Sequence, residues 1–422
     1  MSASPAPPAP QFPLREGEFV AMMAALMALQ ALCIDAMLPA LGQIAADLGE
    51  HDPNRRQLVI GVFLIAAGVF ALLPGALADR FGRRPVLFAG LGIYVVFGIA
   101  CALVSDFTAL LAMRVAQALG SAALAVLPSA IIRDRFGGDR MARAMSTISV
   151  VFMLVPILAP ALGQAVLLVA GWRWIFIGMV GMALAVGVWV YLRLPETLRP
   201  EFRQPIRPLA IARNMAVAAR ERAAIGYVLG SALVFGGLFG FLNSSQQLIA
   251  EHFGAGEWFP LMFAFGAASM AVASFTNSRI VERFGARRVS HTAVLAFIAV
   301  SALQVWQASQ PGETLWRFMP LMAANMCLCG FIGANFGSIA MQPFARIAGA
   351  ASSFQAFARM VISALLGALI GQAYDGSALP LALALLLGGM GSLALVLFSE
   401  RGVLFRRLHP AGTPRQVSPP LP

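Results

Sequence analysis

The sequence contains no lysine: all 30 basic residues among its 422 are arginine. It is also poor in charge, since charged residues make up 12% of the chain and hydrophobic residues 59%. Soluble domains carry about 25% charged residues. The composition therefore excludes a soluble globular protein, and it predicts a chain that crosses a membrane many times.

Cysteine is scarce, and all four cysteines lie within apolar runs: Cys33, Cys101, Cys327 and Cys329. We expect small-residue packing there rather than a disulfide framework. The four histidines show no spacing typical of metal ligands, so we predict no metal site and no cofactor. No nucleophile and base are paired in the sequence, which argues against an integral-membrane enzyme.

Windows of about 20 apolar residues recur along the chain. They predict helices near 19–40, 57–78, 86–104, 107–132, 144–169, 173–194, 223–247, 258–278, 289–307, 316–341, 350–373 and 378–398. We therefore predict an all-α integral membrane fold with twelve transmembrane helices in two pseudo-symmetric six-helix bundles.

Polar segments divide this chain into a disordered cytoplasmic tail, an N-terminal bundle, a cytoplasmic linker, a C-terminal bundle and a second tail: 1–18, 19–198, 199–222, 223–400 and 401–422. The segments on one side hold 24 arginines and those on the other hold four, while Arg114 and Arg359 lie inside predicted helices. Because cytoplasmic loops are enriched in basic residues, both termini are expected in the cytoplasm. The net charge of +11 is thus distributed over alternate loops, so we expect contact with membrane lipid and no nucleic-acid binding.

A charged stretch separates the second and third predicted helices: Gly75-Ala76-Leu77-Ala78-Asp79-Arg80-Phe81-Gly82-Arg83-Arg84-Pro85. Its ionic side chains cannot lie in hydrocarbon, which predicts a tight gating loop at a membrane surface formed by Gly75, Asp79, Arg80, Gly82, Arg83 and Arg84. Gly75 would let two helices approach closely, and Gly82 would supply a flexible or positive-φ position. A weaker copy, Glu282-Arg283-Phe284-Gly285, follows 203 residues after Asp79 and indicates a duplication. The stretch resembles the signature loop of the major facilitator superfamily.

An acidic residue, Asp35, lies within the first apolar run, where an ionised carboxylate is costly, and is a functional candidate for that reason. Pro39 lacks the amide that would bond the carbonyl of Asp35, so a polar notch is expected in the helix. The alternative is that Asp35 lies near the outer interface and only caps the helix. The segment from Ile34 to Leu41 resembles the first-helix signature of the Bcr/CflA drug-efflux branch, which implies that Asp35 and Met37 belong to the transport cavity.

Arg114, Gln117 and Ser121 are spaced three and four apart in the fourth predicted helix and share one face. The run resembles the R-x-x-Q-G motif of drug/proton antiporters, with Ala118 in place of the first glycine. This implies that Arg114 takes part in proton coupling with Asp35, and the alternative is a purely structural charge that anchors two helices.

Two prolines, Pro156 and Pro160, stand four apart in the fifth predicted helix and are followed by Gly163. Each proline removes one helix hydrogen bond, so together they predict a hinge. The segment resembles the antiporter motif in its Bcr/CflA form, although Ala159 and Gln164 replace two of its glycines. The alternative is that these prolines are merely tolerated in a membrane helix.

Polar and aromatic side chains share helix faces in the second half, and we predict that they line the substrate cavity together with Gln117: Phe235, Phe239, Asn243, Asn325, Gln355 and Arg359. They could equally serve helix packing through interhelical hydrogen bonds. The resemblance implies a monomeric exporter of apolar or amphipathic drugs, of the chloramphenicol or bicyclomycin kind, in a bacterial inner membrane, driven by protons. The alternative is a proton-coupled nutrient or metabolite symporter on the same fold.

Overall fold

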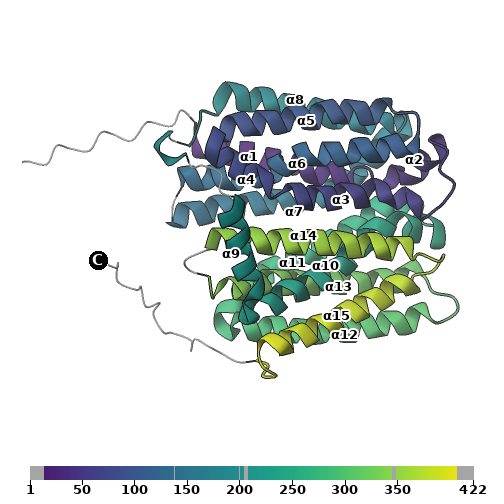
Figure 1. Cartoon of the computed structure of the whole chain (residues 1–422). Helices are drawn as coiled ribbons and strands as arrows, with labels where there is room; N and C mark the ends of the chain where they lie inside the picture. The colour runs from purple at the N-terminus through teal and green to yellow at the C-terminus, as the bar shows by residue number, and fades with distance from the viewer. Residues whose placement is uncertain (1–13, 137, 199, 204–207, 345–347, 406–422) are drawn as a thin grey trace, which may run out of the picture.

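The computed structural model describes residues 14–136, 138–198, 200–203, 208–344 and 348–405. Two groups of roughly parallel helices lie side by side in it (Figure 1). The first group contains α1 (Glu16–Asp35), α2 (Leu41–Asp47), α3 (Leu58–Phe70), α4 (Leu73–Phe81), α5 (Arg83–Leu103), α6 (Phe107–Arg135), α7 (Gly138–Val169) and α8 (Arg173–Arg193). The second contains α10 (Arg222–Gln246), α11 (Phe259–Phe284), α12 (Ala286–Ala308), α13 (Leu315–Met341), α14 (Ala348–Gln372) and α15 (Leu379–Ser399).

The helices have the length and apolarity that a multi-pass membrane protein requires. Within the described residues, ten helical segments could cross a membrane, and the bent pair α3 and α4 adds an eleventh. The apolar part of α7, Leu154–Val169, is shorter than the helices that could cross a membrane. The multi-pass, all-helical prediction is confirmed, whereas the count of twelve spans and the division into two six-helix bundles remain predictions.

The prediction of a loop that starts at Gly75 is wrong, because the chain is helical from Leu73 to Phe81. The predicted helix 57–78 consists of α3 and α4, which meet at an angle of 43°. Only Gly82 connects α4 to α5. No described atom would touch a Cβ added at Gly75, so the close helix approach expected there is not found. An additional helix, α9 (Pro208–Arg220), lies within the predicted linker.

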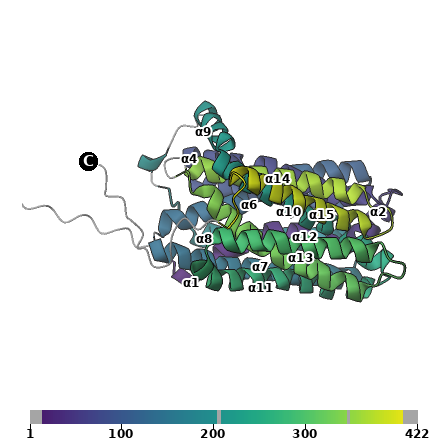
Figure 2. The ribbon, with the colours of Figure 1, turned by 90° about the horizontal axis from the view of Figure 1, so that it is seen from below.

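The bundle has two distinct ends. We call the end where the described chain begins and stops, and where α9 lies across the helices, the terminal end (Figures 1 and 2). The opposite end, which contains α2, is the distal end. The predicted tails, apart from 14–18 and 401–405, lie outside the described residues. Between the groups, α3 packs on α14 and α7 on α11.

Candidate functional site

The first membrane helix is broken at Asp35. Here α1 ends, and the chain turns through Ala36 and Met37 into a short 3₁₀ helix, Leu38–Ala40, before α2 begins. Because Pro39 has no N–H, the carbonyl of Asp35 loses its helical partner, which is the notch that the sequence predicts. Asp35 is only 5% exposed. In the described part of the chain, its carboxylate has no hydrogen-bonding or ion-pairing partner.

The proline segment of α7 packs directly on this break. A Cβ at Gly163 would overlap the carbonyl oxygen of Ala36 and would lie 3.2 Å from Cγ of Pro39. Glycine at 163 therefore allows α7 to approach the backbone of the broken helix. The helix of α7 continues without interruption through Pro156 and Pro160. The structure thus brings Gly163 of the predicted hinge segment to the break that carries Asp35, while the hinge motion itself stays a prediction.

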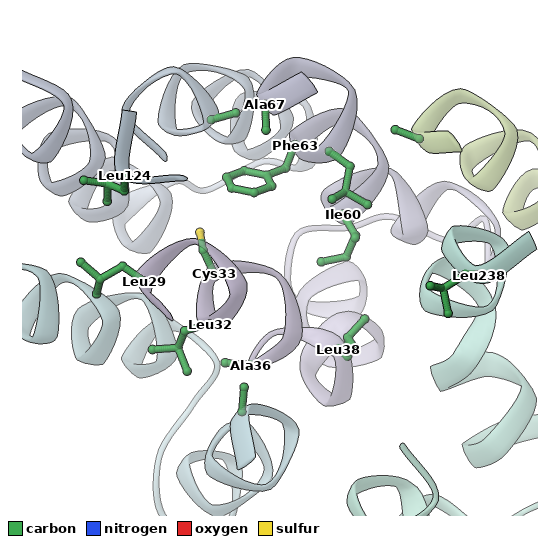
Figure 3. Packing of buried hydrophobic residues seen from close by; sticks show 14 of the residues in the cluster. Leu29, Leu32, Cys33, Ala36, Leu38, Ile60, Phe63, Ala67, Leu124 and Leu238 are labelled. Carbon is green, nitrogen blue, oxygen red and sulfur yellow. The ribbon is translucent and has the colours of Figure 1, made fainter. Parts of the chain in front are cut away.

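Arg114 is fully buried in α6 and contacts a different face of α1. Its Nη2 donates to the carbonyl oxygen of Cys33 at 3.0 Å, and its Nη1 lies 3.0 Å from the Cys33 thiol. The guanidinium also donates to the Gln117 side chain at 2.8 Å and lies 4.1 Å from the ring centroid of Phe63. Figure 3 shows Cys33 on the side of α1 that faces Phe63.

These contacts make Arg114 a cap for the broken helix. The carbonyl of Cys33 lies in the last turn of α1, where carbonyls lack helical partners and a cation is favoured. Asp35 is two residues further on and so points to another face. Among the described contacts, none joins Arg114 to Asp35, so the charge pair expected from the sequence is not formed in this state. Met37, a predicted cavity residue, is fully buried in the turn.

Three of the polar and aromatic residues predicted in the second half lie near one another. The guanidinium of Arg359 in α14 lies 5.3 Å from the ring centroid of Phe235 in α10. The Phe235 ring packs against Gly333 of α13, and the Gln355 side chain of α14 packs against Gly337 of the same helix. Arg359, Gln355 and Phe235 are only partly buried. They form a mixed polar and aromatic cluster where α10, α13 and α14 meet.

The other predicted residues of this half serve packing. Phe239 presses on Gly367 of α14 and accepts a hydrogen bond at its carbonyl from Asn243, at 2.8 Å. Asn325 is fully buried and faces α12, where it donates to Gln304 at 2.8 Å and accepts from Ser301 at 3.2 Å. For Asn325, the packing alternative describes this structure, because its amide is used between α12 and α13.

At the terminal end, Arg83 is the centre of a charge cluster. Its guanidinium contacts Asp79 at 2.6 Å and Asp134 of α6 at 2.9 Å. The carboxylate of Glu196, which follows α8, accepts from the backbone N–H groups of Arg83 and Arg84 at 3.0 and 3.1 Å. Glu196 therefore caps α5 with a negative charge. Gly82, with φ of 106°, has the positive φ predicted for it. Arg80 is exposed and lies beside the ring of Phe81.

A set of contacts at the distal end was not predicted from the sequence. Asn54 donates to the carbonyls of Gln372 and Tyr374 at 3.0 and 2.9 Å, and Gln57 bonds to Gln247. Arg56 pairs with Glu251 at 2.5 Å. We call these residues, together with Pro53, whose carbonyl accepts from Gln247, the distal latch.

The hydrogen bonds of this latch join the two helix groups at the distal end. Its first-group members follow α2 directly in the chain, so they continue the segment that starts at the α1 break. The sequence signal was a short polar run, Asn54 to Gln57, after Pro53; its partners lie about 190 to 320 residues away.

Comparisons with known proteins agree with this architecture. A family model for the Major Facilitator Superfamily matches residues 19–368. A bicyclomycin resistance protein homologue of Haemophilus influenzae is 28% identical over 364 residues, which is 86% of this chain and 91% of the relative. The multidrug resistance protein MdtL of Escherichia coli (strain HS) is 29% identical over 348 residues, 81% of this chain and 85% of the relative.

Solved structures share the fold at low sequence identity. An inward-facing bacterial homologue of the human lysosomal transporter Spinster aligns with a TM-score of 0.66 at 16% identity, covering 91% of this chain and 94% of the other. The human organic anion transporter MFSD10 aligns with a TM-score of 0.62 at 20% identity, covering 92% and 100%. With the repeated charged turn, the broken first helix and the proline segment of α7, these matches show that the chain belongs to the Major Facilitator Superfamily, as a multi-pass transporter similar to drug-efflux proteins.

Proposed function

We propose that this protein exports apolar or amphipathic drugs in exchange for protons, by alternating access of the two helix groups. The observation that carries the proposal is the buried carboxylate of Asp35 at the break in α1, packed against the proline segment of α7. A buried ionisable group within a membrane segment is retained at a cost, and proton relays are one of its established uses. The names of the relatives support drug efflux as the activity.

The distribution of arginine supports an orientation with the terminal end in the cytoplasm of a bacterial cell. The distal latch would then close the outer side in the state seen here. A state open to the outside must break the bonds of Asn54, Arg56 and Gln57 to the second group.

Asp35 and the latch are joined by one continuous segment. From the break the chain passes through α2 to Asp47, which accepts a hydrogen bond from the Trp172 indole at 2.9 Å, and then to the latch. A change of charge on Asp35 alters the free energy of burying its carboxyl group at the break. The charge of Asp35 therefore favours one position of the segment between the break and the latch over another. A proton and a drug would thus bind at the break in turn, and the latch would be the element that moves between the two states.

Export is tested by expressing the protein in a bacterium that lacks its own pumps and measuring growth on a panel of antibiotics and dyes. We expect resistance to several uncharged or amphipathic compounds, and its loss when an uncoupler removes the proton gradient. Everted vesicles should accumulate the same compounds when a pH gradient, acidic inside, is imposed. Uptake into intact cells instead of export, coupled to the same gradient, would show a symporter and contradict the proposal.

A further inference from the structure

The outer surface of the second helix group contains an apolar groove near the terminal end. Its volume is about 620 Å³. It is lined by the end of α11, the start of α12, the middle of α13 and the ring of Phe405: Ile280, Phe284, Arg288, Val289, Thr292, Ala293, Ala296, Leu328, Phe331 and Phe405. This volume lies within the range of about 300 to 1,000 Å³ that holds small ligands. All three helices are among the candidate membrane spans, so the groove lies between segments that could cross a membrane.

The groove has a charged mouth and an apolar interior. Arg288 and Ala296 both line it and are eight residues apart on α12, which corresponds to about 12 Å along the helix. One leaflet contributes about 15 Å of hydrocarbon to a bilayer. A chain that entered beside Arg288 would therefore run through most of one leaflet.

Arg288 is held at the mouth by the last described residues of the chain. Its Nε donates to the carbonyl oxygen of Phe405 at 3.2 Å, and the N–H of Phe405 donates to Nδ1 of His291 at 3.0 Å. Phe405 has a positive φ of 62°, a conformation that a bulky residue adopts only when its surroundings impose it. Arg288 is itself exposed, so its remaining N–H donors are accessible to a ligand at the surface.

The neighbouring arginine in this turn is already neutralised, whereas Arg288 is not paired with an acid among the described residues. Arg287 forms an ion pair with Glu400 at 2.7 Å. In the first half the second arginine of the turn, Arg84, is covered instead, because it donates to the Tyr191 carbonyl at 2.7 Å and lies over the Tyr191 and Phe88 rings. The charge of Arg288 thus stands at the edge of an apolar groove, near the start of the candidate span Ala286–Ala308.

We propose that this groove binds an anionic phospholipid of the leaflet at the terminal end, with one acyl chain along α12 and the headgroup phosphate on Arg288. A guanidinium and a phosphate match in charge and in hydrogen-bond geometry. The apolar lining takes the acyl chain, and Phe405 closes the groove at the height of the headgroup. This site is separate from the α1 break, so it does not depend on the proposed drug export.

Native mass spectrometry of the full chain, released from detergent, tests the site with phosphatidylglycerol and phosphatidylcholine of identical acyl chains. The unmodified protein should bind phosphatidylglycerol more tightly. Arg288→Gln should lower that affinity by about tenfold, towards the value for phosphatidylcholine, because one charge-assisted contact is lost. Ala296→Phe should weaken both lipids, because it fills the inner part of the groove.

Arg279→Gln is the matched control, because it removes the same charge from an exposed arginine at the same end that does not line the groove. If Arg279→Gln lowered phosphatidylglycerol binding as much as Arg288→Gln, the attraction would be diffuse and the site refuted. Unchanged lipid binding by Ala296→Phe would also overturn the proposal. So would an Ala296→Phe variant that no longer binds an uncharged drug but still binds phosphatidylglycerol.

Discussion

The turns at Gly82 and Gly285 are two copies of one pattern, held by acids in different ways. In the first half, Arg83 lies between two aspartates, while Glu196, after α8, binds the backbone of α5. In the second half, Glu400 occupies the corresponding place after α15, 204 residues later, but it binds the guanidinium of Arg287 and the hydroxyl of Tyr227. The duplication therefore keeps an arginine within two residues after the glycine, Arg83 in the first copy and Arg287 in the second, and an acid after the last helix. The contact between the arginine and this acid changes.

The largest difference between the copies should appear when the central arginine is removed. Arg83→Gln leaves Asp79 and Asp134 without their cation, although Asp134 keeps the Thr197 hydroxyl, and breaking a nearly buried pair such as Arg83 with Asp134 costs about 3 to 5 kcal/mol. Arg287→Gln leaves Glu400 bonded to Tyr227, so we expect a loss of about 1 to 2 kcal/mol. Thermal unfolding in detergent measures both, with the exposed Arg80→Gln as control. Equal losses for the two variants would show that the clusters are equivalent.

The glycines themselves sharpen the comparison. Gly82 and Gly285 have φ of 106° and 85° with extended ψ, a region that other residues occupy at a cost of about 1 to 3 kcal/mol. A Cβ at Gly82 would also lie 2.6 Å from Oε2 of Glu196, whereas no described atom lies within 4 Å at Gly285. Gly82→Ala should therefore cost about 1 kcal/mol more in unfolding free energy than Gly285→Ala. A larger loss for Gly285→Ala would remove Glu196 from the explanation.

The second turn should respond to acid through Glu400. Burial alone would raise the pKa of this carboxyl group, but hydrogen bonds from Tyr227 and Arg287 outweigh it and hold the pKa below its ordinary value. A lowered pKa in the folded state stabilises the fold above the ordinary pKa of about 4.3, and this is lost as the pH falls further. The unfolding temperature should fall between about pH 5 and pH 3, and less steeply in Glu400→Gln. The same slope in both proteins would mean that other carboxylates set it.

Asp79 should matter least for stability. Its side chain is 50% exposed, and Arg83 retains Asp134 when Asp79 is removed, so Asp79→Ala should cost less than about 1 kcal/mol. We nevertheless expect it to cripple drug efflux, because the charge cluster joins α4, α5 and α6 in one of two states. Efflux is compared at equal membrane abundance. Normal export by Asp79→Ala would exclude the cluster from the transport cycle.

The elements of the site that could be predicted were those set by local chemistry. Pro39 removes one donor wherever it stands, so the unpaired carbonyl of Asp35 follows from the sequence. The end of the helix at Asp35 does not, because the predicted helix ran from 19 to 40 and α7 continues through Pro156 and Pro160. The positive φ of Gly82, like the unpaired carbonyl, follows from the sequence. The helical conformation of Asp79 was missed because charge was taken as the mark of a loop, whereas Asp79 ends one helix and pairs with Arg83 at the start of the next, across Gly82.

Contacts that depend on how helices face one another could not be predicted. Asn325 was expected in a cavity, yet it faces Ser301 and Gln304, and nothing in its own helix distinguishes the two orientations. Arg114 was expected beside Asp35 and instead caps the carbonyl of Cys33, because only the packing of α6 on α1 decides which face it meets. The distal latch joins residues that only the assembled fold brings together.

The most direct test of the account is a measurement of proton release on drug binding by the purified protein in weakly buffered detergent solution. The unmodified protein should release protons as a transported drug is added at a pH where Asp35 is partly protonated. Asp35→Asn should bind the drug without that release, while Asp375→Asn, an exposed acid at the distal end, should behave like the unmodified protein. Proton release by Asp35→Asn equal to that of the unmodified protein would contradict the assignment of Asp35 as the proton carrier.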